Sequence, residues 1–211
     1  MPVHEYSTDT IGRHRIIIAA CVLIAIGGAY GLGVLYERVG FTPPWWLDAP
    51  AIFGCYAAIW RIYDQFVWRW TLFGRTVSGI DDYSGEWSGM LHSNYARNAA
   101  LPIELSIKQT SSRILVEVRT ETSNSYSNMA MACSSAGRSK GLRYTYSNEP
   151  RAFAALSMSP HSGIAEIQLS ADRTTLSGQY ENNRHRGTYG TIRAMKVILH
   201  GGNSPREGSS S

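Results

Sequence analysis

Two long apolar runs, separated by a short loop, dominate the N-terminal third of the chain. The first run, 16–36, contains no charged residue, and as a helix it would be about 31 Å long, roughly one hydrocarbon thickness of a bilayer. The second run covers about 45–63, and Pro43 and Pro44 interrupt the helix between them. The pattern predicts a two-helix transmembrane hairpin over 13–70, including an interfacial extension after the second helix.

The charges that flank these runs predict which side of the membrane the rest of the chain occupies. Arg13 and Arg15 precede the first run, and Arg61, Arg69 and Arg75 follow the second, whereas the intervening loop has no such excess. The positive-inside rule therefore predicts that both termini are cytoplasmic. A cleaved signal peptide is the main alternative, but its apolar core is usually shorter, and a second apolar run follows here.

Small residues recur at four-residue spacing in both predicted helices. Such spacing lets helix backbones approach closely. It is compatible with association between molecules and also with packing of the two helices inside one hairpin. The residues expected to support helix association are Gly27, Gly31, Gly33, Gly54 and Ala58.

After the hairpin, the apolar period changes from helical to two, which is typical of half-buried strands. The short, turn-rich links favour an antiparallel barrel over a sandwich. The prediction is an all-β module over 83–200, a small antiparallel eight-stranded up-and-down β-barrel. Segments 1–12, 71–82 and 201–211 are expected to be an N-terminal cytoplasmic segment, a linker and a disordered tail. Expected strands lie near 83–91, 103–107, 114–118, 126–131, 142–146, 152–158, 165–169, 176–180 and 189–197.

The first expected strand carries Gly85, Glu86 and Trp87, which resemble the Gly-x-Trp motif of lipocalin-type barrels. In those barrels the tryptophan closes the base and an arginine on the last strand stacks over it, a role that would fall to Arg193. Together with the preceding hairpin, residues from about 13 to 200 resemble the CD-NTase-associated membrane effectors of CBASS, the cyclic-oligonucleotide-based anti-phage signalling of bacteria. Members of that family have two transmembrane helices and a minimal β-barrel.

The resemblance implies a function. A cytoplasmic barrel would bind a cyclic dinucleotide made by a partner CD-NTase synthase. The molecules would then form homo-oligomers and disrupt the bacterial inner membrane, which kills the cell and limits phage spread. The cyclic dinucleotide would be an activating ligand, with no other cofactor, and the lipid bilayer would be the second partner, with no DNA or RNA involved.

A ligand with two phosphates and two bases needs cationic and aromatic side chains at the rim of a small barrel. Arginine offers paired hydrogen bonds to phosphate, and tyrosine offers a stacking face. Two segments combine these residue types. The candidate ligand-binding residues are Arg138, Lys140, Arg143, Tyr144 and Tyr146 in one segment, and Tyr180, Arg184, His185, Arg186 and Tyr189 in the other.

Other classes of function find little support in the residues. The formal net charge of +4 favours anionic partners only weakly. We identify no catalytic residues and no metal ligands, because no histidine, cysteine and carboxylate spacing suggests either, so we expect a protein that is not an enzyme. Two alternatives stay open. The barrel could be a membrane-tethered lipocalin-like carrier of an apolar ligand, or an interaction module for a protein partner.

Overall fold

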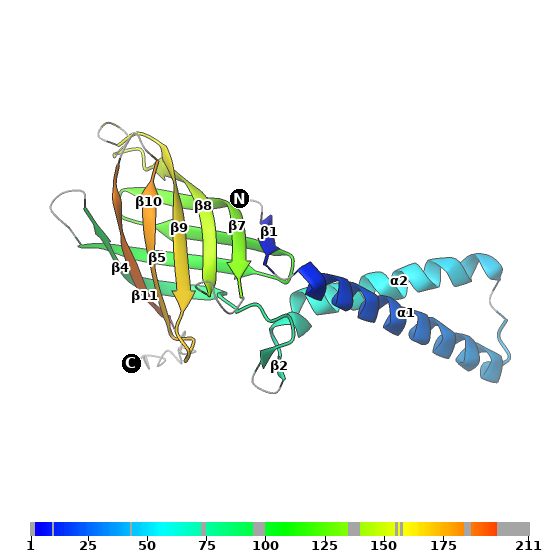
Figure 1. Cartoon of the computed structure of the whole chain (residues 1–211). Helices are drawn as coiled ribbons and strands as arrows, with labels where there is room; N and C mark the ends of the chain where they lie inside the picture. Colours follow the sequence, from blue (N-terminus) through cyan, green and yellow to red (C-terminus); the bar gives the residue numbers. More distant parts are fainter. Residues whose placement is uncertain are drawn as a thin grey trace, which may run out of the picture.

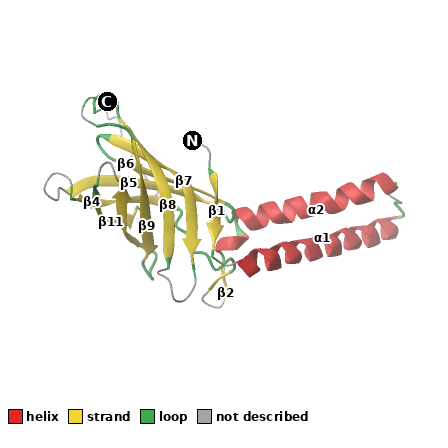
Figure 2. Cartoon of the chain, turned by 45° about the horizontal axis from the view of Figure 1, so that its top comes forward, coloured by secondary structure: helices red, strands yellow, loops and turns green. Residues whose placement is uncertain are grey.

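The structure is a computed structural model that describes residues 3–9, 11–42, 44–72, 75–94, 100–134, 140–154, 156, 158–183 and 187–197. It has two parts. A helical hairpin of α1 (Ile11–Val39) and α2 (Trp45–Gln65) projects from one end of a β-barrel, and the two helices lie side by side (Figure 1). Figure 2 shows the same arrangement from a second direction. The predicted disordered tail, 201–211, lies outside the described residues.

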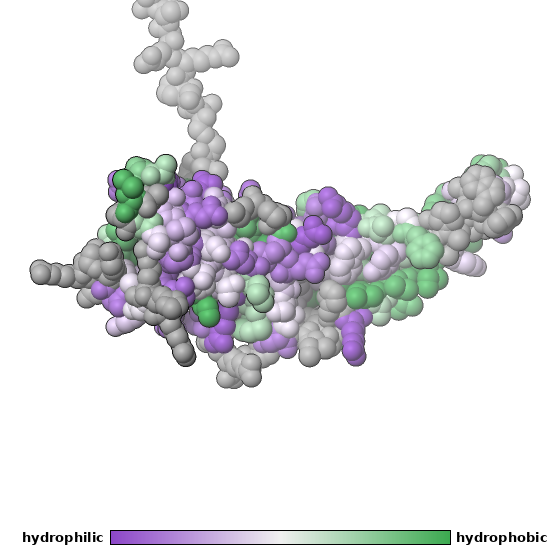
Figure 3. All heavy atoms as spheres, turned by 90° about the horizontal axis from the view of Figure 1, so that it is seen from above, coloured by the Kyte–Doolittle hydropathy of each residue, from purple (hydrophilic) through white to green (hydrophobic). Residues whose placement is uncertain are grey.

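Within the described residues, one helix is long and apolar enough to cross a membrane. It covers Arg15–Val39, with a mean hydropathy of 2.3 over its most apolar window. Cys21 and Ala25 are its buried positions, one turn apart, and they mark the face that packs on α2. Large side chains such as Leu23 are exposed, and Figure 3 shows apolar surface along the hairpin. α1 is therefore covered by protein on one face only.

The segment between α2 and the barrel is folded rather than extended. A 3-10 turn, η1 (Val67–Arg69), follows α2 and places Trp68 in a fully buried position. Two short strands, β2 (Thr71–Leu72) and β3 (Arg75–Thr76), then pair with each other. The predicted linker thus contains a small hairpin next to the base of the helices (Figure 1).

The second part is a closed barrel of nine strands in the order β1-β6-β5-β4-β11-β10-β9-β8-β7. The prediction of eight strands is wrong because β1 (His4–Thr8) from the N-terminal segment joins the wall. The strand expected near 152–158 is also wrong, since 152–154 form a turn. The remaining strands are β4 (Gly85–Ser93), β5 (Ala100–Gln109), β6 (Arg113–Arg119), β7 (Ser123–Cys133), β8 (Gly141–Pro150), β9 (His161–Leu169), β10 (Thr175–Asn182) and β11 (Tyr189–Lys196).

The barrel has one end near the helices, called the base, and an opposite end, called the mouth. Trp87, to which the Gly-x-Trp resemblance assigns closure of the base, is buried there: it is 1% exposed, and its Nε1 donates a hydrogen bond to the Tyr83 carbonyl at 3.1 Å. The cation over its ring is Lys196, whose Nζ lies 5.3 Å from the ring centroid. The expectation for Arg193 is therefore corrected. Arg193 lies between the buried Ile192 and Ala194, so it points outward, and it is exposed.

Gly85 begins the first strand of this base in a conformation that side chains rarely adopt, with φ +135°. A Cβ there would lie 3.0 Å from the Lys196 Cε. We expect Gly85→Ala to lower the free energy of unfolding by about 1–3 kcal/mol, measured by urea denaturation. Gly187→Ala is the control, because Gly187 also has positive φ but a Cβ there would meet nothing within 4 Å. Equal losses in both variants would exclude a contribution from the Lys196 contact.

Candidate functional site

A cavity of about 300 Å³ occupies the barrel interior on the mouth side. Its walls come from eight strands, β4 to β11, and from the loops at the mouth, and they mix apolar, hydroxyl, amide and phenol side chains. Packed side chains, among them Trp87 and Leu105, fill the base of the barrel, and residues of the loops at the mouth line the cavity. The lining residues are Leu91, Ser93, Leu101, Val118, Thr120, Thr122, Ser123, Ser125, Tyr144, Tyr146, Asn148, Met158, His161, Ala165, Tyr180, Asn182, Thr188 and Ile192.

Three tyrosines form the aromatic part of this cavity. Tyr144 and Tyr146 are two residues apart on β8 and so point to the same side, with ring centroids 6.3 Å apart. Tyr180 reaches the cavity from β10. The Tyr146 hydroxyl donates a hydrogen bond of 2.7 Å to Asn182 Oδ1. Burial raises the pKa of all three phenols above the ordinary value, so they are neutral hydrogen-bonding groups at physiological pH.

Asn148 continues the same inward row of β8 and brings an amide to the cavity wall. Its Nδ2 donates to Ser123 Oγ at 2.9 Å and to Ser125 Oγ at 2.8 Å on β7. Its Oδ1 is buried and has no hydrogen-bond partner among the described residues. A buried acceptor without a partner costs about 1–3 kcal/mol. A ligand that brings an N–H or O–H donor to Asn148 Oδ1 would therefore gain affinity.

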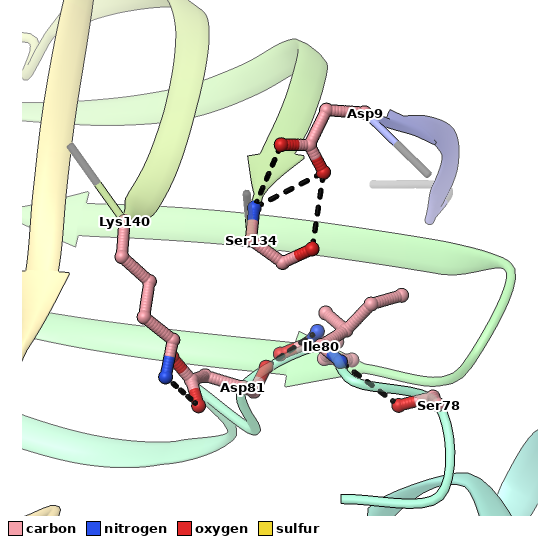
Figure 4. Close-up of polar contacts among 7 residues, drawn as sticks. Asp9, Ser78, Ile80, Asp81, Ser134 and Lys140 are labelled. Atoms are coloured by element: carbon pink, nitrogen blue, oxygen red, sulfur yellow. Dashed lines mark hydrogen bonds and ion pairs between the residues drawn. The ribbon is translucent and has the colours of Figure 1, made fainter. Parts of the chain in front are cut away.

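The structure splits each of the two predicted ligand-binding clusters and brings their tyrosines together. Tyr144, Tyr146 and Tyr180 lie together in the cavity. Lys140, in contrast, lies at the base, where its Nζ pairs with Asp81 at 2.8 Å (Figure 4). It is held about one strand length from the mouth, so it is not a lining residue.

The other predicted cations and Tyr189 are likewise not part of the described cavity wall. Arg143 points outward between the inward Leu142 and Tyr144, and its Nε pairs with Glu166 Oε2 at 2.9 Å. Tyr189 is 62% exposed. Arg138, Arg184, His185 and Arg186 lie outside the described residues.

The sequence analysis missed the polar half of the wall. Asn148 lies two residues after Tyr146, so the alternation that placed the tyrosines inside also places the amide inside. Ser123 and Ser125 occupy inward positions on β7 by the same rule. These small polar residues were overlooked because the search weighted charge and aromatic rings. Among the described residues, no group of three His, Cys, Asp or Glu could hold a metal ion.

Comparison with known proteins adds the family. Residues 78–196 match the family described as Cap15, cyclic dinucleotide receptor domain. One similar protein is CD-NTase-associated protein 15 of Yersinia aleksiciae, 26% identical over 144 residues, which cover 68% of each chain. Another is CD-NTase-associated protein 15 of Staphylococcus schleiferi, 31% identical over 90 residues, or 43% of this chain and 48% of that protein. The family match begins in the linker after α2, ends with the last strand of the barrel, and covers more than half of the chain. The chain therefore belongs to the Cap15 family of cyclic dinucleotide receptor domains.

Proposed function

We propose that this protein is a CBASS effector whose barrel binds a cyclic dinucleotide in the mouth cavity. Binding drives association of the membrane helices, and the assembled helices disrupt the bacterial inner membrane. The ligand class follows from the family, whose description names a cyclic dinucleotide receptor. The observation that carries the position of the site is the cavity itself, which three tyrosines line together with Asn148, whose Oδ1 has no hydrogen-bond partner among the described residues.

The chemistry of the cavity suits a nucleobase. Tyrosine rings provide stacking faces, which are worth about 1–3 kcal/mol per base when removed by alanine substitution. Asn148 Oδ1 can accept a hydrogen bond from a base amino or imino group, and the hydroxyls of Ser123 and Ser125 lie beside it. A base placed here would combine stacking with hydrogen bonds to its edge. That is how proteins recognise unstacked bases.

The size of the cavity decides how much of the ligand it takes. A volume of about 300 Å³ is at the lower end of the roughly 300–1,000 Å³ range of ligand pockets. We therefore place one base inside the barrel and the phosphates at the mouth. No Lys or Arg lines the cavity among the described residues. Asn182 and Thr188, on either side of segment 184–186, do line it, which supports Arg184, His185 and Arg186 as phosphate ligands.

The membrane part of the proposal rests on α1 and its flanks. The span Arg15–Val39 is long enough to cross a bilayer. We propose that α2 crosses as the second helix of the hairpin and that the positive-inside rule places the barrel in the cytoplasm. A nucleotide produced inside the cell then reaches the mouth without crossing the membrane.

The small residues of α1 support association between molecules. Gly27 and Gly31 are exposed, and a Cβ added at either would meet nothing within 4 Å. They are not needed for close packing inside the hairpin, where Cys21 and Ala25 are buried instead. Of the two explanations for the motif, the one that involves a second molecule is therefore favoured for Gly27 and Gly31.

Thermal unfolding of the full chain in detergent tests the ligand. The probes are cyclic dinucleotides with each pair of the four RNA bases, in both 3′,3′ and 2′,3′ linkages. We expect at least one to raise the melting temperature. We also expect Asn148→Ala to weaken its binding about tenfold, since 1.4 kcal/mol corresponds to a factor of ten. Thr145→Ala, on the same strand but facing outward, is the control. Absence of any shift across the panel would refute the proposal.

A carrier of an apolar ligand is the second candidate, because Leu91, Leu101, Val118, Met158 and Ile192 also line the cavity. It predicts a different result. Lipid or another apolar molecule would co-purify with the full chain, and the cyclic dinucleotides would fail to raise the melting temperature. Mass spectrometry of an organic extract of the purified protein distinguishes the two functions.

A further inference from the structure

The barrel wall contains a strand that comes directly before the membrane helix. β6 and β7 pair with each other only near the mouth, at the register pairs from Glu117↔Tyr126 to Arg119↔Asn124. Toward the base they separate, and β1 occupies the gap (Figures 1 and 2). It pairs with β6 in antiparallel orientation, through His4↔Ile114 and Glu5↔Arg113. It pairs with β7 in parallel orientation, through Tyr6↔Ala130, Ser7↔Met131 and Thr8↔Ala132.

Ser127 marks the point where β6 and β7 diverge. Its hydroxyl, in a side chain that is 5% exposed, accepts a hydrogen bond from the Val116 N–H at 2.9 Å. The same oxygen lies 2.7 Å from the His4 Nε2 of β1. The register between β7 and β8 shifts just after it, between Ser127 and Met129. The three strands therefore meet at one buried hydroxyl, next to an irregularity that lets β7 bend.

The ligand cavity begins immediately above this point. Val118 and Ser125, which form one of the few direct β6–β7 register pairs, line the cavity. Val118 lies two residues after Val116, whose N–H donates to Ser127, and Ser125 lies two residues before Ser127. Two residues correspond to about 7 Å along a strand. A ligand that changes the spacing of β6 and β7 at the mouth therefore changes the width of the gap that holds β1.

The connection between β1 and α1 is short and held by hydrogen bonds. The Asp9 carboxylate accepts hydrogen bonds from Ser134 N at 3.0 and 3.1 Å and from Ser134 Oγ at 3.1 Å (Figure 4). The Asp9 N–H donates to the Ala132 carbonyl at 3.4 Å. α1 begins at Ile11, two residues later. Displacement of β1 along or away from β7 is thus transmitted to the first turn of α1.

The second helix is attached to a different part of the wall. At the C-terminal end of α2, the Asp64 carboxylate accepts a hydrogen bond from Ser112 N at 2.8 Å, and its carbonyl accepts one from Ser111 N at 3.0 Å. Both serines belong to the turn between β5 and β6. A side-chain hydrogen bond joins this turn to β1, because the Tyr6 hydroxyl donates to the Thr110 carbonyl at 3.1 Å. Movement of β1 relative to the turn therefore moves α1 relative to α2.

We propose that β1 couples the ligand cavity to the membrane hairpin: a ligand at the mouth shifts β1 within the β6–β7 gap, and this shift moves α1 against α2. The inference rests on the proposed function, since it explains how the same ligand acts at a distance. The resting position is held by the Tyr6 contact with Thr110 and the Asp9 contacts with Ser134. Activation releases the first of these contacts and repositions the second.

A reversible disulfide tests whether β1 must move. Ser7→Cys with Met131→Cys joins β1 to β7 at a register pair that lies next to the inward pair Tyr6 and Ala130. The full chain is placed in dye-loaded vesicles of phosphatidylethanolamine and phosphatidylglycerol, and leakage is started with the panel member that raises the melting temperature. We expect the oxidised double variant to keep its melting shift and to leak roughly tenfold more slowly than after reduction, within the usual range of allosteric coupling.

Ser177→Cys with Gln168→Cys provides the matched control, because it joins β10 to β9 at an outward register pair remote from β1. Oxidation of this control is expected to leave leakage unchanged. Full leakage from the oxidised β1 variant would overturn the proposal, and so would equal inhibition in the control, which would indicate general rigidity of the barrel. Failure of the wild-type chain to bind any panel member is a separate result and refutes the proposed function instead.

Tyr6→Phe provides a test without cysteines. It removes the hydroxyl that joins β1 to the β5–β6 turn and keeps the ring that packs against the core. The variant should leak several times faster than the wild type in the absence of ligand, while the ligand-induced melting shift persists. Unchanged basal leakage would show that this contact does not hold the resting position, contrary to the proposal.

Discussion

Replacement of Trp87 by alanine is expected to lower the free energy of unfolding by about 3–5 kcal/mol. Trp87 is one of the largest fully buried side chains, and it points inward from β4 at the base of the barrel, opposite Leu105 of β5. Its removal leaves a cavity and also leaves the Tyr83 carbonyl without the donor that it now has. Because typical domains are stable by only about 5–15 kcal/mol, the variant should be close to the limit of folding. Urea denaturation followed by far-UV circular dichroism measures the loss.

Lys196→Ala is the control for this prediction. It removes the cation above the Trp87 ring, 5.3 Å from the centroid, but leaves the ring and its hydrogen bond in place. A cation–π contact at an exposed side chain contributes about 0.5–1 kcal/mol, so the loss should be several times smaller than for Trp87→Ala. Similar losses in the two variants would contradict the view that the ring, rather than the cation, closes the base.

Much of the barrel could be predicted because alternation of apolar and polar residues is a local property. The positions that alternate on β4, β5 and β8 are also the positions that the closed barrel buries. β1 could not be found in this way. Its five residues, His-Glu-Tyr-Ser-Thr, show no apolar alternation, and the strand exists because β6 and β7, more than 100 residues away, leave a gap that needs backbone partners. Such a requirement is visible only in three dimensions.

Alternation along the strands also predicted part of the candidate site. Alternation placed Tyr144, Tyr146 and Tyr180 inside the barrel, where they line the cavity. Applied strictly, it would also have shown that Arg193 points outward, because Ile192 and Ala194 beside it are inward. Grouping Lys140 with Tyr146 failed because proximity in sequence was taken as proximity in space. Along an up-and-down strand, six residues separate one end of the barrel from the other.

Two glycines of α1 form the helix face that we propose for association between molecules. Gly27 and Gly31 are four residues apart, so they lie on one face of the helix. That face is exposed and differs from the face of Cys21 and Ala25, which packs on α2. In a membrane, exposed small residues allow a helix from a second molecule to approach closely, and van der Waals packing then drives association. Bulky side chains at these positions should block the association without disturbing the hairpin, since added Cβ atoms meet nothing nearby.

The double variant Gly27→Leu and Gly31→Leu is therefore expected to reduce ligand-triggered leakage of vesicles by about tenfold or more, since each 1.4 kcal/mol lost from association is a factor of ten. The melting shift with cyclic dinucleotide should stay the same, because the barrel is untouched. Val22→Leu serves as the control. It adds bulk at another exposed position of α1, roughly 140° around the helix axis from Gly27, and should leak like the wild type. Normal leakage from the double glycine variant would show that this face takes no part in assembly, and the proposed oligomer would then have to use another surface of the hairpin.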